Sequence, residues 1–245
     1  MGIFRVVRLP DVEYARNANL YLVTDGGFKG LGTNYGKLDD WFNDPQNAMP
    51  HMFRNGSLND LAGAVQGAKA LAIARNLGGI MLVFAPITVG DYHSRYKQYN
   101  PAVDAVVVRF QRLTLAAQKT GVIWTHSFAG PSTTIALAEV AKPDVKYLRH
   151  HSVAPAFYHA NLYKGALGRT HVRTTIYQAG GDLVSRNGSF THNPFALARG
   201  SVHDDFILQK KNLTFVPFKG GDHPLADYIS CAEFPKGPIA SDHAT

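Results

Sequence analysis

Hydrophobic residues occur along this chain in two patterns, short unbroken runs and longer stretches with helical spacing. The clearest unbroken runs lie at 19–24, 80–85 and 122–125. Between them, apolar residues recur at helical spacing over 58–77 and 101–120, which predicts two helices. Gly78 and Gly121 follow these stretches and are typical of the residues that end helices. Strands that are apolar throughout and alternate with helices indicate a mainly parallel sheet that is buried on both faces.

Weaker signals complete the predicted order of elements. Further strands are expected at 3–8, 145–154, 172–178 and 213–218, and shorter helices at 132–141, 194–198 and 224–231. The glycine-rich stretch 25–36 is interpreted as a loop, and 38–57 as an irregular or partly helical peripheral segment. We therefore predict a single α/β domain over 1–245, a three-layer α/β/α sandwich with its core at about 18–230 and a tail after about 233.

Composition narrows the classes of protein to consider. The 245 residues include 45% hydrophobic ones, enough for one large globular domain. Cys231 is the only cysteine, which excludes an intramolecular disulfide and leaves no cysteine pair to bind a metal. No run of about 18 apolar residues occurs, so we expect no membrane span. Arg5 and Arg8 interrupt the first apolar residues, so we expect no signal peptide and a cytoplasmic protein, although export by a specialised system would leave the same pattern.

The formal net charge of +7 favours anionic partners in general. The basic residues are scattered, however, and Lys210–Lys211 is the longest uninterrupted basic run. Scattered charge is typical of an ordinary surface, so we expect no nucleic-acid partner. Peripheral contact with anionic lipid is compatible with this surface, and the sequence leaves the oligomeric state open.

Candidate chemistry follows three of the predicted strands. Functional residues of an open parallel sheet gather just beyond the carboxyl ends of its strands. Ser127 follows the strand at 122–126, Asp182 follows the one at 172–179, and His223 follows the one at 213–218. A serine, a carboxylate and a histidine thus stand in this order at one expected edge of the sheet.

Four short motifs around these residues resemble those of a known family. T-H-S-F-A-G at 125–130 is similar to G-H-S-x-G-G, and L-V-T-D-G-G-F at 22–28 is similar to L-V-H-G-G-G-F. G-G-D-L-V at 180–184 and G-G-D-H-P-L at 220–225 are similar to acid and histidine turns. Over roughly 18–230 the chain resembles an α/β-hydrolase of the lipase/esterase type. The resemblance implies the α/β-hydrolase fold, here with a small cap or none.

The resemblance also implies roles for the residues in these motifs. Ser127 would be the nucleophile, His223 the general base, and Asp182 the group that orients the histidine. The oxyanion hole would take one backbone N–H from Phe128 and another from Gly26 or Gly27. Such a site needs no cofactor and no metal.

The sequence departs from the family pattern in the motif around the serine and in the oxyanion loop. Thr125 and Ala129 stand where the motif around the serine has glycines. Thr24 and Asp25 replace the usual His-Gly of the oxyanion loop.

These motifs predict a serine hydrolase that cleaves a carboxylic ester through an acyl-enzyme. Its substrate would be a small-molecule or lipid ester, with a lipid acyl ester as the first choice. Two alternatives stay open, an acyltransferase or thioesterase on the same fold and a catalytically silent binding or scaffold protein. Rivals also exist for two members of the triad. The rival acids are Asp204 and Asp205, and the rival histidines are His192 and His203.

Other conspicuous residues carry weaker hypotheses. His126 is expected to point away from the site. His150 and His151 are neighbours on a predicted strand and should face opposite ways, so no metal is expected there. The glycines at 26–36 match neither G-x-G-x-x-G nor G-x-x-x-x-G-K-[ST]. An acyl pocket or small lid is one interpretation of the apolar residues Met49, Met52, Phe53, Phe157, Tyr158 and Tyr163.

Overall fold

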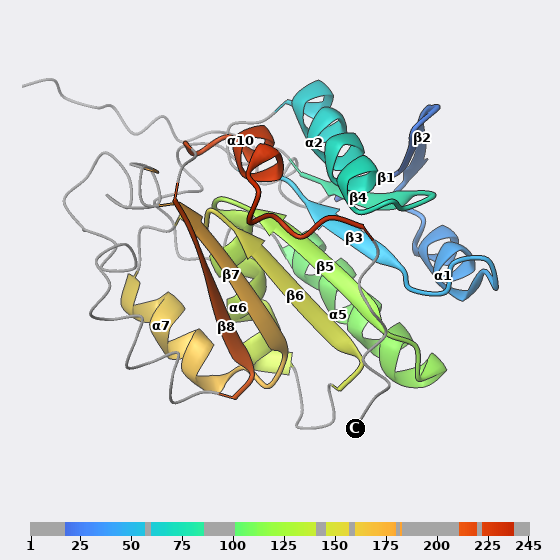
Figure 1. Ribbon diagram of the computed structural model, residues 1–245. Helices are drawn as coiled ribbons and strands as arrows, with labels where there is room; N and C mark the ends of the chain where they lie inside the picture. Colours follow the sequence, from blue (N-terminus) through green and yellow to red (C-terminus); the bar gives the residue numbers. More distant parts are fainter. Residues whose placement is uncertain are drawn as a thin grey trace, which may run out of the picture.

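The computed structural model contains one mixed sheet of eight strands with helices on both faces (Figure 1). It describes residues 18–56, 60–85, 101–140, 146–156, 160–179, 182, 211–219 and 222–237. The strand predicted at 3–8 and the helix predicted at 194–198 lie outside these residues.

The strands of the sheet lie in the order β2-β1-β4-β3-β5-β6-β7-β8. Their bounds are β1 Asn19–Thr24, β2 Gly27–Gly32, β3 His51–Arg54, β4 Ile80–Phe84, β5 Gly121–His126, β6 Leu148–Val153, β7 Arg173–Ala179 and β8 Leu213–Phe218. From β4 to β8 all neighbours are parallel, whereas β1 runs antiparallel to both β2 and β4. The prediction of a mainly parallel sheet is confirmed.

The helices form the two outer layers. Their bounds are α1 Tyr35–Asn43, α2 Leu61–Ala74, α5 Pro101–Ala117, α6 Ala129–Val140, α7 Ala160–Arg169 and α10 Leu225–Ser230. Helices α2 and α10 cover one face of the sheet, while α1, α5 and α6 cover the other, with α7 beside α6 (Figure 1). The three-layer α/β/α architecture is therefore confirmed.

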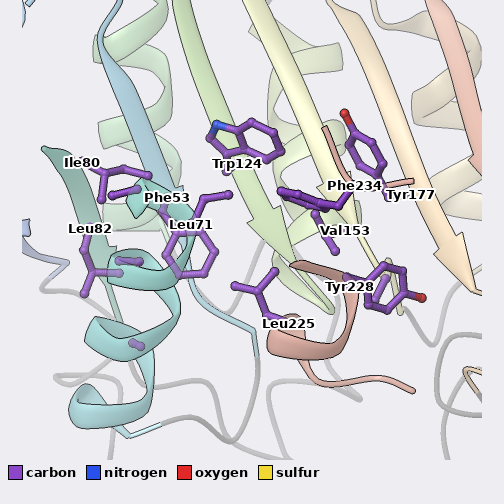
Figure 2. Packing of buried hydrophobic residues seen from close by; sticks show 14 of the residues in the cluster. Phe53, Leu71, Ile80, Leu82, Trp124, Val153, Tyr177, Leu225, Tyr228 and Phe234 are labelled. Atoms are coloured by element: carbon purple, nitrogen blue, oxygen red, sulfur yellow. The ribbon is translucent and has the colours of Figure 1, made fainter. Parts of the chain in front are cut away.

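Each face of the sheet has its own apolar core, because the strands are apolar on both sides. The core beneath α2 and α10 is centred on Trp124 of β5 and is shown in Figure 2. The core beneath α1 and α5 includes Phe42, Phe110 and Ile123. These two cores fix β5 in the middle of the sheet and so fix the place of the residue that follows it.

Two segments differ from the sequence prediction. The stretch 25–36, predicted as a loop, contains strand β2 and the start of α1. The segment 38–57, predicted as peripheral, contains β3, a central strand between β4 and β5. His51 and Arg54 stand at the two ends of β3 and are both 2% exposed, so polar residues that are buried hid this strand from the hydrophobic pattern.

The last described residues, predicted as a tail after about 233, pack onto the sheet. The segment after α10 crosses the α2 face (Figure 1), and the ring of Phe234 lies 5.8 Å from those of both Trp124 and Tyr177 (Figure 2). Arg75, at the end of α2, donates to the carbonyl oxygen of Pro235, and the N–H of Gly237 donates to a carbonyl oxygen of the same helix. This segment therefore closes the core beneath α2 and α10.

Truncation of Phe234 to alanine should test this role. Phe234 is 1% exposed, so Phe234→Ala should lower the free energy of unfolding by about 3–5 kcal/mol through lost burial and a residual cavity. Phe28→Ala is the matched control, because Phe28 is 54% exposed and its loss should cost less than about 1 kcal/mol. Urea unfolding of both variants measures the difference. Equal losses in the two variants would contradict the assignment.

Candidate active site

Ser127 stands at a tight turn between β5 and α6. Its φ is 54°, a left-handed conformation that residues other than glycine rarely adopt. Its backbone N–H donates to the carbonyl oxygen of Val153 at the end of β6 (2.9 Å), and its own carbonyl accepts from Gly130 (3.0 Å). Both bonds tie the turn to regular structure, which is how a strained residue is held in place.

The turn closes without the two missing glycines. The Thr125 side chain turns toward β6, where its Oγ1 hydrogen-bonds to Nε2 of His150 at 2.9 Å. The close approach falls at Gly130 instead, where an added Cβ would lie 2.2 Å from Oγ of Ser152. Glycine is thus required three residues after the serine, and the threonine is accommodated by a polar partner.

The structure brings the three sequence-predicted catalytic residues together. Ser127 Oγ lies 2.8 Å from Nε2 of His223, and Nδ1 of the same ring lies 3.0 Å from each carboxylate oxygen of Asp182. An ionised carboxylate can only accept, so Nδ1 carries the proton and Nε2 is free to accept from the serine hydroxyl. The rivals at 192, 203, 204 and 205 lie outside the described residues.

The three side chains are largely buried, and the acid is the most deeply buried of them. Asp182 is fully buried, Ser127 is 4% exposed, and the side chain of His223 is 18% exposed. The hydroxyl of Tyr228 on α10 donates to Oδ2 of Asp182 at 2.8 Å. Sequence reasoning missed this tyrosine, because nothing in the pattern distinguishes it from a core aromatic residue.

His126 does not point away from the site as predicted. Its Nε2 donates to the backbone carbonyl oxygen of His223 at 2.8 Å, and the two rings lie 5.1 Å apart. Burial, with the neighbouring His223, lowers the pKa of His126 to about 4, so the ring is neutral at physiological pH. The prediction failed because His126 has a partner at the site in the backbone of His223.

Gly26 and Gly27, predicted to supply an oxyanion donor, are not brought to the serine. They lie in the turn between β1 and β2, and β1 ends beside Ile80, where β4 begins. The prediction treated 19–24 as a parallel strand, whose carboxyl end would lie near Ser127. Because β1 runs antiparallel to β4, its carboxyl end lies at the amino ends of the parallel strands, away from Ser127.

Instead, the segment after β3 packs against the serine. A Cβ added to Gly56 would lie 2.9 Å from Cβ of Ser127 and 3.1 Å from Nδ1 of His126. The side chain of Asn55 is 2% exposed and donates to the carbonyl oxygen of Gly56 at 2.8 Å, which orients this segment. The other predicted donor, Phe128, is buried and follows the serine directly.

A serine at a strained strand-to-helix turn, followed in the chain by an acid and a histidine at the same edge of the sheet, is the architecture of a known fold. This arrangement is similar to that of the α/β-hydrolases. No protein-family model matches the chain, and no curated protein sequence is significantly similar to it.

Comparison with solved structures finds several chains that are similar to this one. They include a dienelactone hydrolase from Anabaena variabilis, with 16% identity, coverage of 77% of this chain and 86% of that one, and a TM-score of 0.47. A thermostable esterase from Pseudomonas putida has 11% identity, coverage of 78% and 70%, and a TM-score of 0.49. A carboxylesterase from Lactobacillus plantarum has 12% identity, coverage of 72% and 74%, and a TM-score of 0.47.

The sequence also suggested an acyl pocket or small lid, and its described residues have other places in the fold. Met52 and Phe53 are core residues of β3, and Tyr163 is buried on α7, while Phe157 and Tyr158 lie outside the described residues. A cavity of about 500 Å³, lined in part by Met49, Trp41 and His51, opens at the opposite edge of the sheet from Ser127. It is therefore not the substrate site of this serine.

The two neighbouring histidines of β6 lie on opposite faces of the sheet. His150 contacts Thr125, whereas His151 stacks on Trp124 with ring centroids 4.3 Å apart. Within the described ranges, no group of three His, Cys, Asp or Glu side chains is placed to hold a metal ion.

Nor does any helix in those ranges have the length and apolar character needed to cross a bilayer.

Buried neutral histidines make the stability of the fold depend on pH. Burial, with nearby Arg54 and Arg75 respectively, lowers the pKa values of His150 and His51 to about 3, and His126 titrates at about 4. Below about pH 6.5 the unfolded chain binds a proton at each of these rings and the folded chain does not. The free energy of unfolding should therefore fall from pH 7 to pH 5, by up to about 1.4 kcal/mol per pH unit for each ring.

Urea unfolding at several pH values measures this slope. Calorimetry also measures how many protons the chain takes up when it unfolds at pH 5. This number should be about one lower in His51→Asn than in wild type. A flat stability profile between pH 7 and pH 5 would contradict the assignment.

Proposed function

We propose that this protein is a serine hydrolase that cleaves a carboxylic ester through an acyl-enzyme. The observation that supports the proposal most directly is the unbroken chain of hydrogen bonds from Ser127 through His223 to the buried Asp182. A serine hydroxyl is a poor nucleophile until a base removes its proton, and His223 Nε2 lies 2.8 Å from that hydroxyl.

In the proposed reaction, Ser127 Oγ attacks the ester carbonyl carbon while His223 Nε2 takes its proton. Asp182 stabilises the imidazolium through the bond to Nδ1. The tetrahedral intermediate collapses when the imidazolium protonates the leaving alcohol, which leaves an acyl-serine. Water then repeats the sequence with His223 as base and releases the carboxylic acid. A different acceptor in this last step would make the same site an acyltransferase.

The developing oxyanion needs preorganised donors. We assign the first to the backbone N–H of Phe128, at the amino end of α6, where the helix dipole also favours negative charge. We assign the second to the segment after β3 at Gly56, which packs against the serine, in place of Gly26 or Gly27. The loss of one such donor typically costs about 3–4 kcal/mol of transition-state stabilisation.

Labelling by a fluorophosphonate probe and hydrolysis of a short-chain nitrophenyl ester test the proposal together. Wild type should react with both, and Ser127→Ala with neither, because the probe phosphonylates, and the ester acylates, the same serine oxygen. Asp182→Asn should lower kcat by about 10³–10⁴-fold, since an amide no longer holds the imidazole in its productive tautomer.

Asp222→Asn is the matched control for the acid. Asp222 directly precedes His223 and accepts its backbone N–H at 2.8 Å, but it makes no described contact with the ring. Its loss should leave kcat within about threefold of wild type. A well-folded wild type that neither labels nor hydrolyses esters would overturn the proposal in favour of a silent binding protein.

The pair Gly56→Ala and Gly26→Ala separates the two assignments of the second oxyanion donor. The added methyl at position 56 meets the serine Cβ at 2.9 Å, so this variant should lose at least about tenfold in kcat. At position 26 the nearest atom to the added methyl is 3.9 Å away, so activity should be unchanged. The opposite result in ester hydrolysis would restore the hairpin glycine as the donor.

A further inference from the structure

We infer that Tyr228 is a positioning residue of this site, which holds Asp182 in the orientation that His223 requires; the inference rests on the proposed function. Tyr228 lies on α10, five residues after His223, and is completely buried. Its hydroxyl donates to Oδ2 of Asp182 and accepts from the backbone N–H of Ala179, both at 2.8 Å.

The acid needs such a partner because of where it lies. Asp182 is fully buried, and an ionised carboxylate out of water is stable only when donors surround it. Both of its oxygens lie 3.0 Å from Nδ1 of His223, so a rotation of the carboxyl group would disturb that bond directly. The hydroxyl of Tyr228 fixes Oδ2 and thereby fixes this rotation.

The tyrosine is itself held by three elements. Its oxygen is bound to the last residue of β7 through Ala179 N–H, and its ring centroid lies 5.2 Å from that of Phe218, the last residue of β8. Figure 2 shows Tyr228 and Leu225 projecting from α10 into the core of this face. The short segment that carries the base therefore also carries the group that orients the acid.

The surroundings of Tyr228 favour its protonated form, which can donate. Burial, and then the negative charge of Asp182, raise the pKa of Tyr228 above its ordinary value. The hydroxyl thus keeps its proton whenever Asp182 is charged. Other titratable groups near the tyrosine or the histidine include His126, Asp222 and Cys231.

The test is the variant Tyr228→Phe, which removes one donor and keeps the ring. Loss of the O–H dipole leaves Asp182 more negative toward His223, so the imidazolium gains stability. The acid limb of the kcat/KM profile and the NMR titration midpoint of His223 Cε1–H should both move up by about 0.5 pH unit. At its plateau kcat should fall about tenfold because the carboxylate is less well oriented, with KM unchanged.

Tyr177→Phe is the matched control. It also removes a buried hydroxyl that makes a hydrogen bond, to Nδ1 of His151 at 2.7 Å, but it has no described contact with the triad. It should lower the unfolding midpoint without moving the pH limb or the His223 titration. If Tyr228→Phe behaves in the same way, Tyr228 is only structural and the inference is wrong.

A second variant keeps the test decisive if Tyr228→Phe does not fold. Replacement of Tyr228 by 3-fluorotyrosine preserves its size and strengthens its O–H as a donor, so the titration midpoint of His223 should move down. An unchanged midpoint in this variant would overturn the inference. The NMR readout does not depend on turnover. An inactive wild type whose His223 still responds to position 228 would therefore refute the proposed function alone, and an active wild type whose His223 does not respond would refute the positioning role alone.

Discussion

The site depends first on one strained backbone conformation. Ser127 adopts φ 54°, at a cost of about 1–3 kcal/mol for a residue with a Cβ, and the surrounding structure must impose it. The hydrogen bond from the N–H of Ser127 to the carbonyl oxygen of Val153 on β6 helps to hold this conformation. Gly130 has no side chain, which allows α6 to begin close to Ser152. Everything else at the site is arranged around a side chain that this turn projects away from the strand.

Polar side chains inside the sheet support this turn. His150 satisfies Thr125 beneath the serine, Arg54 donates to Thr133 on α6 at 2.6 Å, and Trp124 donates to His51 at 3.0 Å. Each of these groups would be costly to bury alone, but in pairs they fix distances between neighbouring elements more sharply than apolar packing does. As a result, hydrogen bonds within the sheet hold in place the residues at the carboxyl ends of its strands.

Much of this could be predicted from the sequence, and the failures have physical causes. The continuous apolar runs at β4 and β5 predicted the parallel sheet, and the carboxyl-end rule then predicted which residues gather beyond it. The meeting of Ser127, Asp182 and His223 followed from that rule. Strand β3 was missed because the buried polar residues His51 and Arg54 form its two ends and leave only two apolar residues between them. Once it was missed, 19–24 was taken as a parallel strand, which moved the oxyanion prediction to the wrong edge.

The order in which the triad appears along the chain has a consequence for its assembly. The serine precedes its histidine by 96 residues, and the histidine and α10 belong to the last part of the described fold. A chain that is still being made therefore contains the turn at Ser127 long before it contains His223. Under the proposed function, the Ser127 hydroxyl becomes a nucleophile only when β8 and α10 dock, so its reactivity is withheld until the sheet is complete.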